Sequence, residues 1–118
     1  MTRQEIFEYC REKYGAEPEY PGEGWNAVLR HTDTKKQYAV IMEVSYDKLG
    51  ISGDGDVDIV NLKCDSSLIK SLRSQAGYLP AYHMDEDNWV SILLDGTVSE
   101  VNIKSLLDLS YRLTNVCS

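Results

Sequence analysis

The stretch 81–96, AYHMDEDNWVSILLDG, constrains the fold of this chain more than any other segment. Its run Trp89–Leu94 contains a single polar residue, so a β-strand formed there would be apolar on both faces. A strand of this kind needs cover on both sides, which is typical of the centre of a sheet. We therefore expect Trp89–Leu94 to be the central strand and Trp89 to be its largest buried anchor.

The other strands are predicted from β-rich runs and from the turn signals between them. Residues 33–36 are polar and join two such runs at a length typical of a β-hairpin. Residues 46–56 contain three glycines and are expected to form an irregular loop. Pro80 interrupts the chain before stretch 81–96, in which 85–88 is a polar turn. Besides Trp89–Leu94, the strands expected are Trp25–Thr32, Gln37–Ser45, Val57–Cys64 and a brief one at Tyr82–Met84.

Three segments space their apolar residues as amphipathic helices do. Thr2 and Glu5 form the Thr-x-x-Glu pattern of a capping box, so the first helix is expected to begin there. Asp65 is placed to cap a second helix at about 66–76, and Ser99 to cap a last helix of about fifteen residues. The apolar stripes are Ile6, Phe7, Cys10 and Tyr14 in the first helix, Leu68, Ile69, Leu72 and Ala76 in the second, and Ile103, Leu106, Leu107 and Leu113 in the last.

The order of these elements predicts an α+β fold. A helix, three strands, a second helix, a strand pair and a last helix favour a two-layer sandwich, with an antiparallel sheet of about five strands and helices packed on one face. The 118 residues fit one domain spanning 1–118, because a chain of this size can bury a single core without disulfides or metals. No repeat, linker or low-complexity segment divides it.

Composition and charge restrict the function. Nineteen Asp and Glu against 12 Lys and Arg give a net charge of −7, which opposes a phosphate backbone unless the basic residues gather on one face. The three cysteines are widely spaced and form no C-x-x-C, so reduced thiols are expected. The sequence has no apolar run long enough for a membrane helix and no signal-peptide pattern at its start. A cytoplasmic protein without a membrane partner is expected.

Several short motifs lie in order along the second half of the chain: Lys63-Cys64 before a capped helix, Leu72-Arg73, Pro80 to Met84, Trp89, Leu94-Asp95-Gly96 and Ser110-Tyr111. Together they resemble the MmcQ/YjbR family of small bacterial proteins, and the resemblance covers nearly the whole chain. It implies a fold similar to that of the frataxin-like (CyaY-like) proteins, and it implies DNA binding, the role usually assigned to the family from its shape. The acidic run 85–87 departs from the family, which often has a basic residue there.

The basic residues that could contact DNA fall in two groups. One group, Arg30, Lys35 and Lys36, lies on the first predicted hairpin and its turn, and the other, Lys63, Lys70 and Arg73, flanks or lies on the second predicted helix. A hairpin with a basic tip resembles a wing, and the double-wing mode proposed for the family would use such elements. The alternative is that these turns are polar because they are solvated, and that the lysines oppose aggregation at a sheet edge.

Two other functions are consistent with the sequence. An acidic surface would suit a protein-interaction or regulatory module that attracts a basic protein partner. A small-ligand pocket is the third possibility, because such pockets combine aromatic residues with a few polar groups. The residues expected to line that pocket are Trp25, Tyr82, His83 and Trp89.

The sequence contains none of the common motifs of catalysis or metal binding. It has no G-x-S-x-G, no glycine-rich phosphate loop and no H-E-x-x-H, so neither an enzyme nor a cofactor is predicted. Asp54, Asp56 and Asp58 are spaced as in a calcium loop, but Ile59 replaces the glycine that such a loop needs for its sharp turn. No metal site is predicted, and His83 is interpreted as a hydrogen-bonded structural residue rather than a catalytic one.

Overall fold

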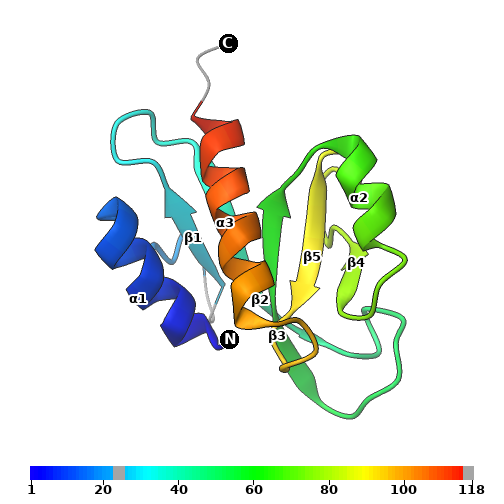
Figure 1. Cartoon of the computed structure of the whole chain (residues 1–118). Helices are drawn as coiled ribbons and strands as arrows, with labels where there is room; N and C mark the ends of the chain where they lie inside the picture. The colour runs from blue at the N-terminus through cyan, green and yellow to red at the C-terminus, as the bar shows by residue number, and fades with distance from the viewer. Residues whose placement is uncertain (23–25, 116–118) are drawn as a thin grey trace.

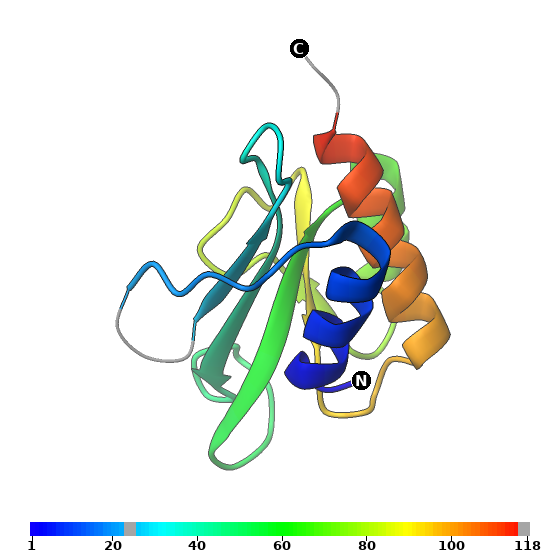
Figure 2. The ribbon, with the colours of Figure 1, turned by 90° about the vertical axis from the view of Figure 1, so that its left-hand side faces the viewer.

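The computed structural model describes residues 1–22 and 26–115, which form an open antiparallel sheet of five strands with three helices (Figure 1). The strands are β1 (Ala27–Arg30), β2 (Gln37–Ser45), β3 (Asp56–Lys63), β4 (Tyr78–Pro80) and β5 (Trp89–Leu93), and the helices are α1 (Arg3–Tyr14), α2 (Ser66–Leu72) and α3 (Glu100–Thr114). The spatial order of the strands is β1-β2-β3-β5-β4. Figure 2 shows the helices on one side of the sheet, so the predicted α+β architecture is confirmed.

The sheet is apolar on both faces because each face has its own cover. On the helix side, Val60 and Leu62 of β3 belong to the main buried cluster with the apolar faces of the helices. On the other side, Ile59 of β3 and Leu93 of β5 form a smaller cluster, against which side chains of the loop 46–55 pack. This alternation is the period of two that a strand imposes on its side chains. The core is therefore split between two layers of unequal size.

The position of β5 differs from the prediction. The central strand is β3, and β5 lies between β3 and the edge strand β4. Tyr82–Met84 is not a strand, and the edge strand forms earlier, at Tyr78–Pro80. A proline has no backbone N–H to donate, so it is excluded from interior strands. Pro80 is tolerated in β4 because β4 is an edge strand. A strand one place from the edge can still be apolar on both faces when helices cover one side and loops the other.

Trp89 is not the buried anchor that the sequence predicted. Its side chain is only partly buried, whereas Val90 and Ile92 of the same strand are fully buried. Trp89 is the first residue of β5, at the end of the sheet, and it belongs to neither of the two buried clusters. Among the described residues, Tyr38 is the largest fully buried side chain, and leucines and isoleucines such as Ile6, Leu29 and Ile41 follow it.

The helix ends show which caps form. Glu5 N donates to Thr2 Oγ1 at 3.2 Å and Thr2 N donates to Glu5 Oε1 at 2.9 Å, which confirms the capping box. Ser99 Oγ accepts from Asn102 N at 3.3 Å, which confirms the cap of α3. Asp65 makes no side-chain cap bond to α2.

The second helix is shorter than expected: it ends at Leu72 and not near residue 76. Ala76 is exposed. Gly77 then turns the chain into β4 with a φ of 93°. A side chain at Gly77 would lie 2.5 Å from Val98 Cγ2, so this close approach requires glycine. Within the described residues, no helix is long and apolar enough to cross a membrane.

Candidate functional site

A pocket of about 400 Å³ opens at the end of the sheet where β2 begins, β3 ends and β5 begins. Its lining combines four basic residues with one large aromatic ring. The residues are Arg30, Lys35, Lys36, Gln37, Lys63, Trp89, Leu113 and Thr114. No acidic side chain among the described residues lines it, although the chain as a whole has a net charge of −7. We call it the basic pocket.

The turn between β1 and β2 supplies two of the lysines. His31 N donates to Lys36 O at 2.9 Å and Lys35 N donates to His31 O at 3.0 Å, so the backbone closes on itself at both ends of the turn. Lys35 has a φ of 64°, a left-handed conformation that few residues other than glycine adopt. The turn therefore holds two exposed lysines beside the pocket.

Arg30 supports this turn as well as lining the pocket. Its guanidinium donates to Lys35 O at 3.2 Å and lies 3.3 Å from Glu19 Oε2. The ion pair is largely exposed, so it contributes little to the free energy of folding. It nevertheless offsets part of the charge of Arg30.

Lys63 and Trp89 form the other wall. They are register partners on the neighbouring strands β3 and β5, where side chains of directly opposed residues lie next to each other. The strand ends are fixed by the backbone, since Cys64 N donates to Asn88 O at 2.8 Å and Trp89 N donates to Asp85 O at 2.9 Å. The pKa of Asp85 is lowered by hydrogen bonds from Asn88 and from the backbone of Asp87, and the charge of Lys63 adds to this effect.

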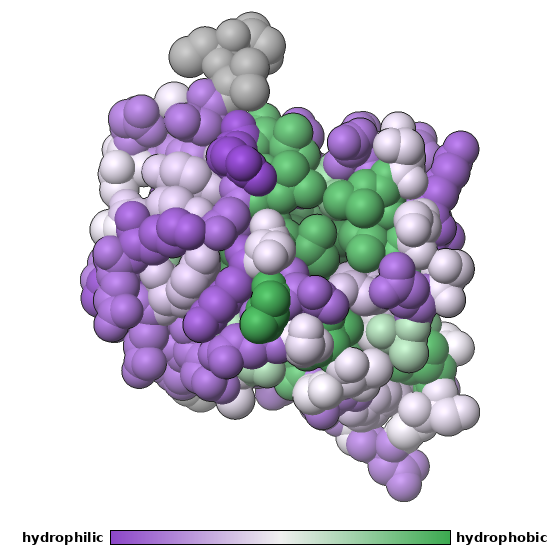
Figure 3. Space-filling view, viewed as in Figure 1, coloured by the Kyte–Doolittle hydropathy of each residue, from purple (hydrophilic) through white to green (hydrophobic). Residues whose placement is uncertain are grey.

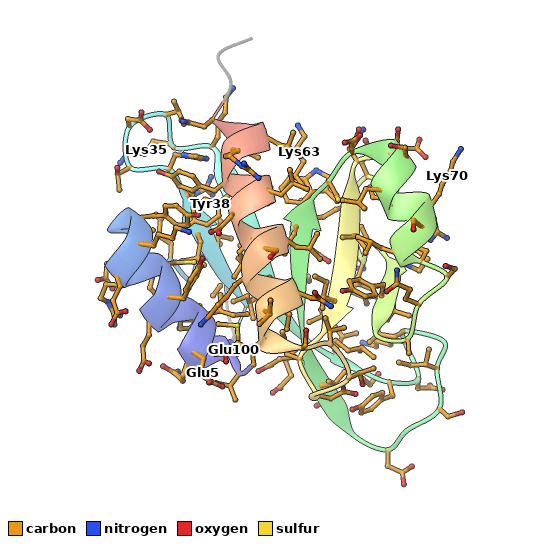
Figure 4. All side chains as sticks on the ribbon, in the orientation of Figure 1. Glu5, Lys35, Tyr38, Lys63, Lys70 and Glu100 are labelled. Carbon is orange, nitrogen blue, oxygen red and sulfur yellow. The ribbon has the colours of Figure 1, made fainter. Side chains whose placement is uncertain are left out.

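The predicted DNA-binding residues are thus divided by the structure. Arg30, Lys35, Lys36 and Lys63 meet at the basic pocket. Lys70 lies on α2 and Arg73 directly follows that helix, and neither lines the pocket. In Figure 4, Lys35 and Lys70 extend to opposite sides of the molecule, with Lys63 between them.

The aromatic residues of the predicted ligand pocket do not meet in one cavity. Tyr82 and His83 line a separate pocket of about 400 Å³ beside β2, together with Glu43 and Asp56. Trp89 lines the basic pocket instead, and Trp25 lies outside the described residues. A single pocket built from these four residues is therefore not present among the residues that the structure describes.

His83 also differs from its interpretation as a hydrogen-bonded structural residue. Its side chain is exposed, and its ring stacks on that of Tyr82 with centroids 4.1 Å apart and an angle of 11° between the planes. Its φ of 60° turns the chain after Tyr82. Ser91 Oγ accepts from Tyr82 N at 2.9 Å and Asn61 Nδ2 donates to Tyr82 O at 3.1 Å, so buried polar groups of the sheet hold this loop.

The structurally important histidine is His31, which the sequence did not single out. Its side chain is 1% exposed, and its ring lies 4.1 Å from that of Tyr111 and 5.3 Å from that of Tyr38. Nδ1 has no hydrogen-bond partner within the described part of the chain. Burial lowers the pKa of His31. No pattern predicted this role, because His31 stands between a strand and a polar turn.

A second group of residues missed by the sequence lies between α1 and α3. The carboxylate of Asp108 accepts hydrogen bonds from Tyr9, from Tyr14 and, at 2.8 Å, from the ammonium of Lys13. Burial opposes ionisation of Asp108, but these three donors outweigh it and lower its pKa. Lys13, Tyr14 and Asp108 of this cluster also line a pocket of about 430 Å³, together with Arg112. Because Asp108 already holds its three donors, we interpret the cluster as a link between two helices.

The remaining surface shows no metal chemistry in the part of the chain that is described. Asp58 of the calcium-like spacing is paired with Arg3 at 2.7 Å. No group of three potential metal ligands occurs among the described residues.

In Figure 3, hydrophilic side chains cover α1 and the hairpin, and hydrophobic ones gather between α3 and α2. Leu72 and Leu106 line a smaller pocket of about 260 Å³ in that region.

Known proteins resemble this chain over nearly its full length. The crystal structure of a protein from Pseudomonas syringae has a TM-score of 0.93 and 40% identity, and the match covers 98% of this chain and 100% of that one. YyaQ of Bacillus subtilis is 46% identical over 116 residues, or 97% of this chain and 98% of YyaQ. YjbR of Escherichia coli K12 is 29% identical over 95% of this chain and 86% of its own length. The YjbR family model matches residues 11–113, and the chain therefore belongs to the YjbR family.

Proposed function

We propose that this protein is a non-catalytic DNA-binding protein that contacts phosphates through the basic pocket. The observation that carries the proposal is the meeting of Lys35, Lys36 and Lys63 from two separate segments around one pocket. An acidic chain can bind a polyanion only if its cations are gathered in this way. Arg30 supports the turn that presents two of these lysines.

The proposal uses fewer contact residues than the double-wing arrangement that the family resemblance implies. The β1–β2 turn with Lys35 and Lys36 is the wing, and Lys63 contacts the same ligand from the end of β3. Lys70 and Arg73 are left out of the interface, because they do not line the pocket. They provide a matched pair of exposed basic residues for a control.

The proposal is tested by the salt dependence of binding to duplex DNA, measured by fluorescence anisotropy. The logarithm of the affinity should fall linearly with the logarithm of the salt concentration, with a slope of about −0.9 per neutralised phosphate. The double change Lys35→Ala with Lys36→Ala should reduce the magnitude of the slope by about two and weaken all sequences alike.

The control is Lys70→Ala with Arg73→Ala, which removes the same charge outside the pocket. It should leave the slope and the affinity close to those of the parent protein. Equal losses in the two double variants would mean that only the overall charge matters. Binding weaker than about 0.1 mM at low salt would remove the proposal, because that is the weak end of non-specific DNA binding.

A second candidate is the binding of a basic protein segment at the pocket of Tyr82 and His83. Glu43 and Asp56 line that pocket, and a stacked pair of aromatic rings can accept a guanidinium. A pull-down from native lysate with and without nuclease distinguishes the two candidates. A protein retained after nuclease treatment and lost on Glu43→Gln would support this one, and retention of nucleic acid would support the first.

A further inference from the structure

Among the residues that the structure describes, no contact explains the place of the Trp89 indole in the basic pocket. It is partly exposed and belongs to neither of the two buried clusters. Among the described residues it makes no stacking or cation–π contact with another side chain. Val90, the next residue, is fully buried in the main cluster. A large aromatic ring kept outside the core, in a pocket, is available to a ligand.

The backbone that carries this ring is fixed at the strand end. Trp89 begins β5 opposite Lys63 of β3, and the backbone N–H of Trp89 donates to Asp85 O at 2.9 Å. The preceding residue, Asn88, accepts from Cys64 N at 2.8 Å, so both sides of the strand end are fixed to neighbouring backbone. A ring on a strand that is fixed in this way is a better binding platform than one on a loop.

From this geometry we propose that the basic pocket takes an unpaired base of single-stranded DNA, which stacks on Trp89 while Lys35, Lys36 and Lys63 hold the flanking phosphates. This inference rests on the proposed function and names its substrate class. Lysines beside an aromatic platform are the combination by which proteins bind single strands. The pocket volume of about 400 Å³ lies within the range for small ligands.

A duplex would leave the platform unused. Its bases are stacked inside the helix, so a wing that reads only its backbone needs the lysines but has no use for an indole in a pocket. An unpaired base can leave its neighbours and present a flat face to Trp89. Gln37 also lines the pocket and offers an amide to the edge of that base.

The test uses a Trp25→Phe variant of the full chain, in which Trp89 is the only tryptophan because the chain has two. This variant is titrated with three probes: a short oligothymidylate, a duplex with the same number of phosphates, and an abasic strand of the same length. Intrinsic fluorescence reports stacking on Trp89, and anisotropy reports total binding. The oligothymidylate should bind about tenfold more tightly than the abasic strand and should quench the fluorescence of Trp89.

The matched variants separate stacking from charge. Trp89→Ala should lose about tenfold in affinity for oligothymidylate and nothing for the abasic strand, whereas Trp89→Phe should keep most of the affinity. The comparison of the three probes on the parent protein needs no substitution at Trp89, so it stands even if Trp89→Ala folds poorly.

The outcomes distinguish this inference from the proposed function. Equal, salt-dependent binding of all three probes without a change in Trp89 fluorescence would overturn the inference and leave the proposed function intact. Absence of binding to every probe at low salt would overturn both.

Discussion

His31 Nε2 lies 2.8 Å from Thr114 Oγ1, and this contact joins the hairpin turn to the last turn of α3. The Thr114 hydroxyl donates to Ser110 O at 2.8 Å, so it accepts from His31, whose Nε2 is the protonated nitrogen. Thr114 also lines the basic pocket. The turn that carries Lys35 and Lys36 is therefore anchored from behind by a buried hydrogen bond.

The first prediction concerns this hydrogen bond. Thr114→Val removes the hydroxyl and leaves the buried Nε2–H of His31 without an acceptor, which should lower the free energy of unfolding by about 1 to 3 kcal/mol. Thr114→Ser keeps the hydroxyl and should lose less. Urea denaturation followed by circular dichroism measures both variants. Thr114→Val keeps the methyl group, so a negligible loss in that variant would show that the hydrogen bond contributes nothing to stability.

The second prediction is a dependence of stability on pH through His31. Burial lowers its pKa below the ordinary 6.5; the charge of Lys36 acts in the same direction, whereas the charge of Asp33 and the backbone of Tyr111 act in the opposite one. The unfolded chain then takes up this proton at a higher pH than the folded protein. The contribution of neutral His31 to the free energy of unfolding should be complete above about pH 6.5. It should decrease as the pH falls below that value.

This dependence is measured from thermal midpoints between about pH 7 and pH 5, above the range in which most carboxylates titrate. His31→Gln should remove most of the slope. The matched control is His83→Gln, which replaces the exposed histidine and should leave the slope unchanged. A slope that persists in His31→Gln would assign it to other groups.

The third prediction compares Trp89 with a buried neighbour on β5. Ile92 is fully buried, so Ile92→Ala should cost about 2 to 5 kcal/mol through lost transfer energy and the cavity that remains. Trp89→Ala removes a larger side chain from a partly exposed site and should cost less than Ile92→Ala. Chemical denaturation measures the free energy of unfolding of both variants. A larger decrease for Trp89→Ala than for Ile92→Ala would place the Trp89 ring in the core.

The fourth prediction concerns the start of α3. Ser99→Ala removes the acceptor for Asn102 N and should cost about 0.5 to 2 kcal/mol. Ser99→Asp supplies another acceptor at the same position and should recover most of the loss. An unchanged denaturation midpoint in Ser99→Ala would show that the backbone N–H is satisfied by solvent.

Local features of the fold were predictable because neighbouring residues determine them. The capping box of Thr2 and Glu5 needs only four consecutive residues, and the Ser99 cap acts within one helical turn. Strand β2 was predicted with its observed bounds, and β3 within one residue at each end, because alternation and polar turns mark them. Helix α2 ends at Leu72 instead of near residue 76, and the turn at Gly77 that follows approaches Val98, which is distant in the sequence.

The sequence by itself determined the fold class, the helix starts and the basic character of the β1–β2 turn, since these depend on composition, spacing and contacts within a few residues. Only the tertiary structure decided that Trp89 stands outside the core, that His31 is buried against Thr114, and that Lys63 meets the turn while Lys70 does not. Each of these outcomes depends on strand order and on which residues face each other across the sheet. A period of two assigns a residue to a face of a strand, but it does not specify the neighbouring strand or what covers that face.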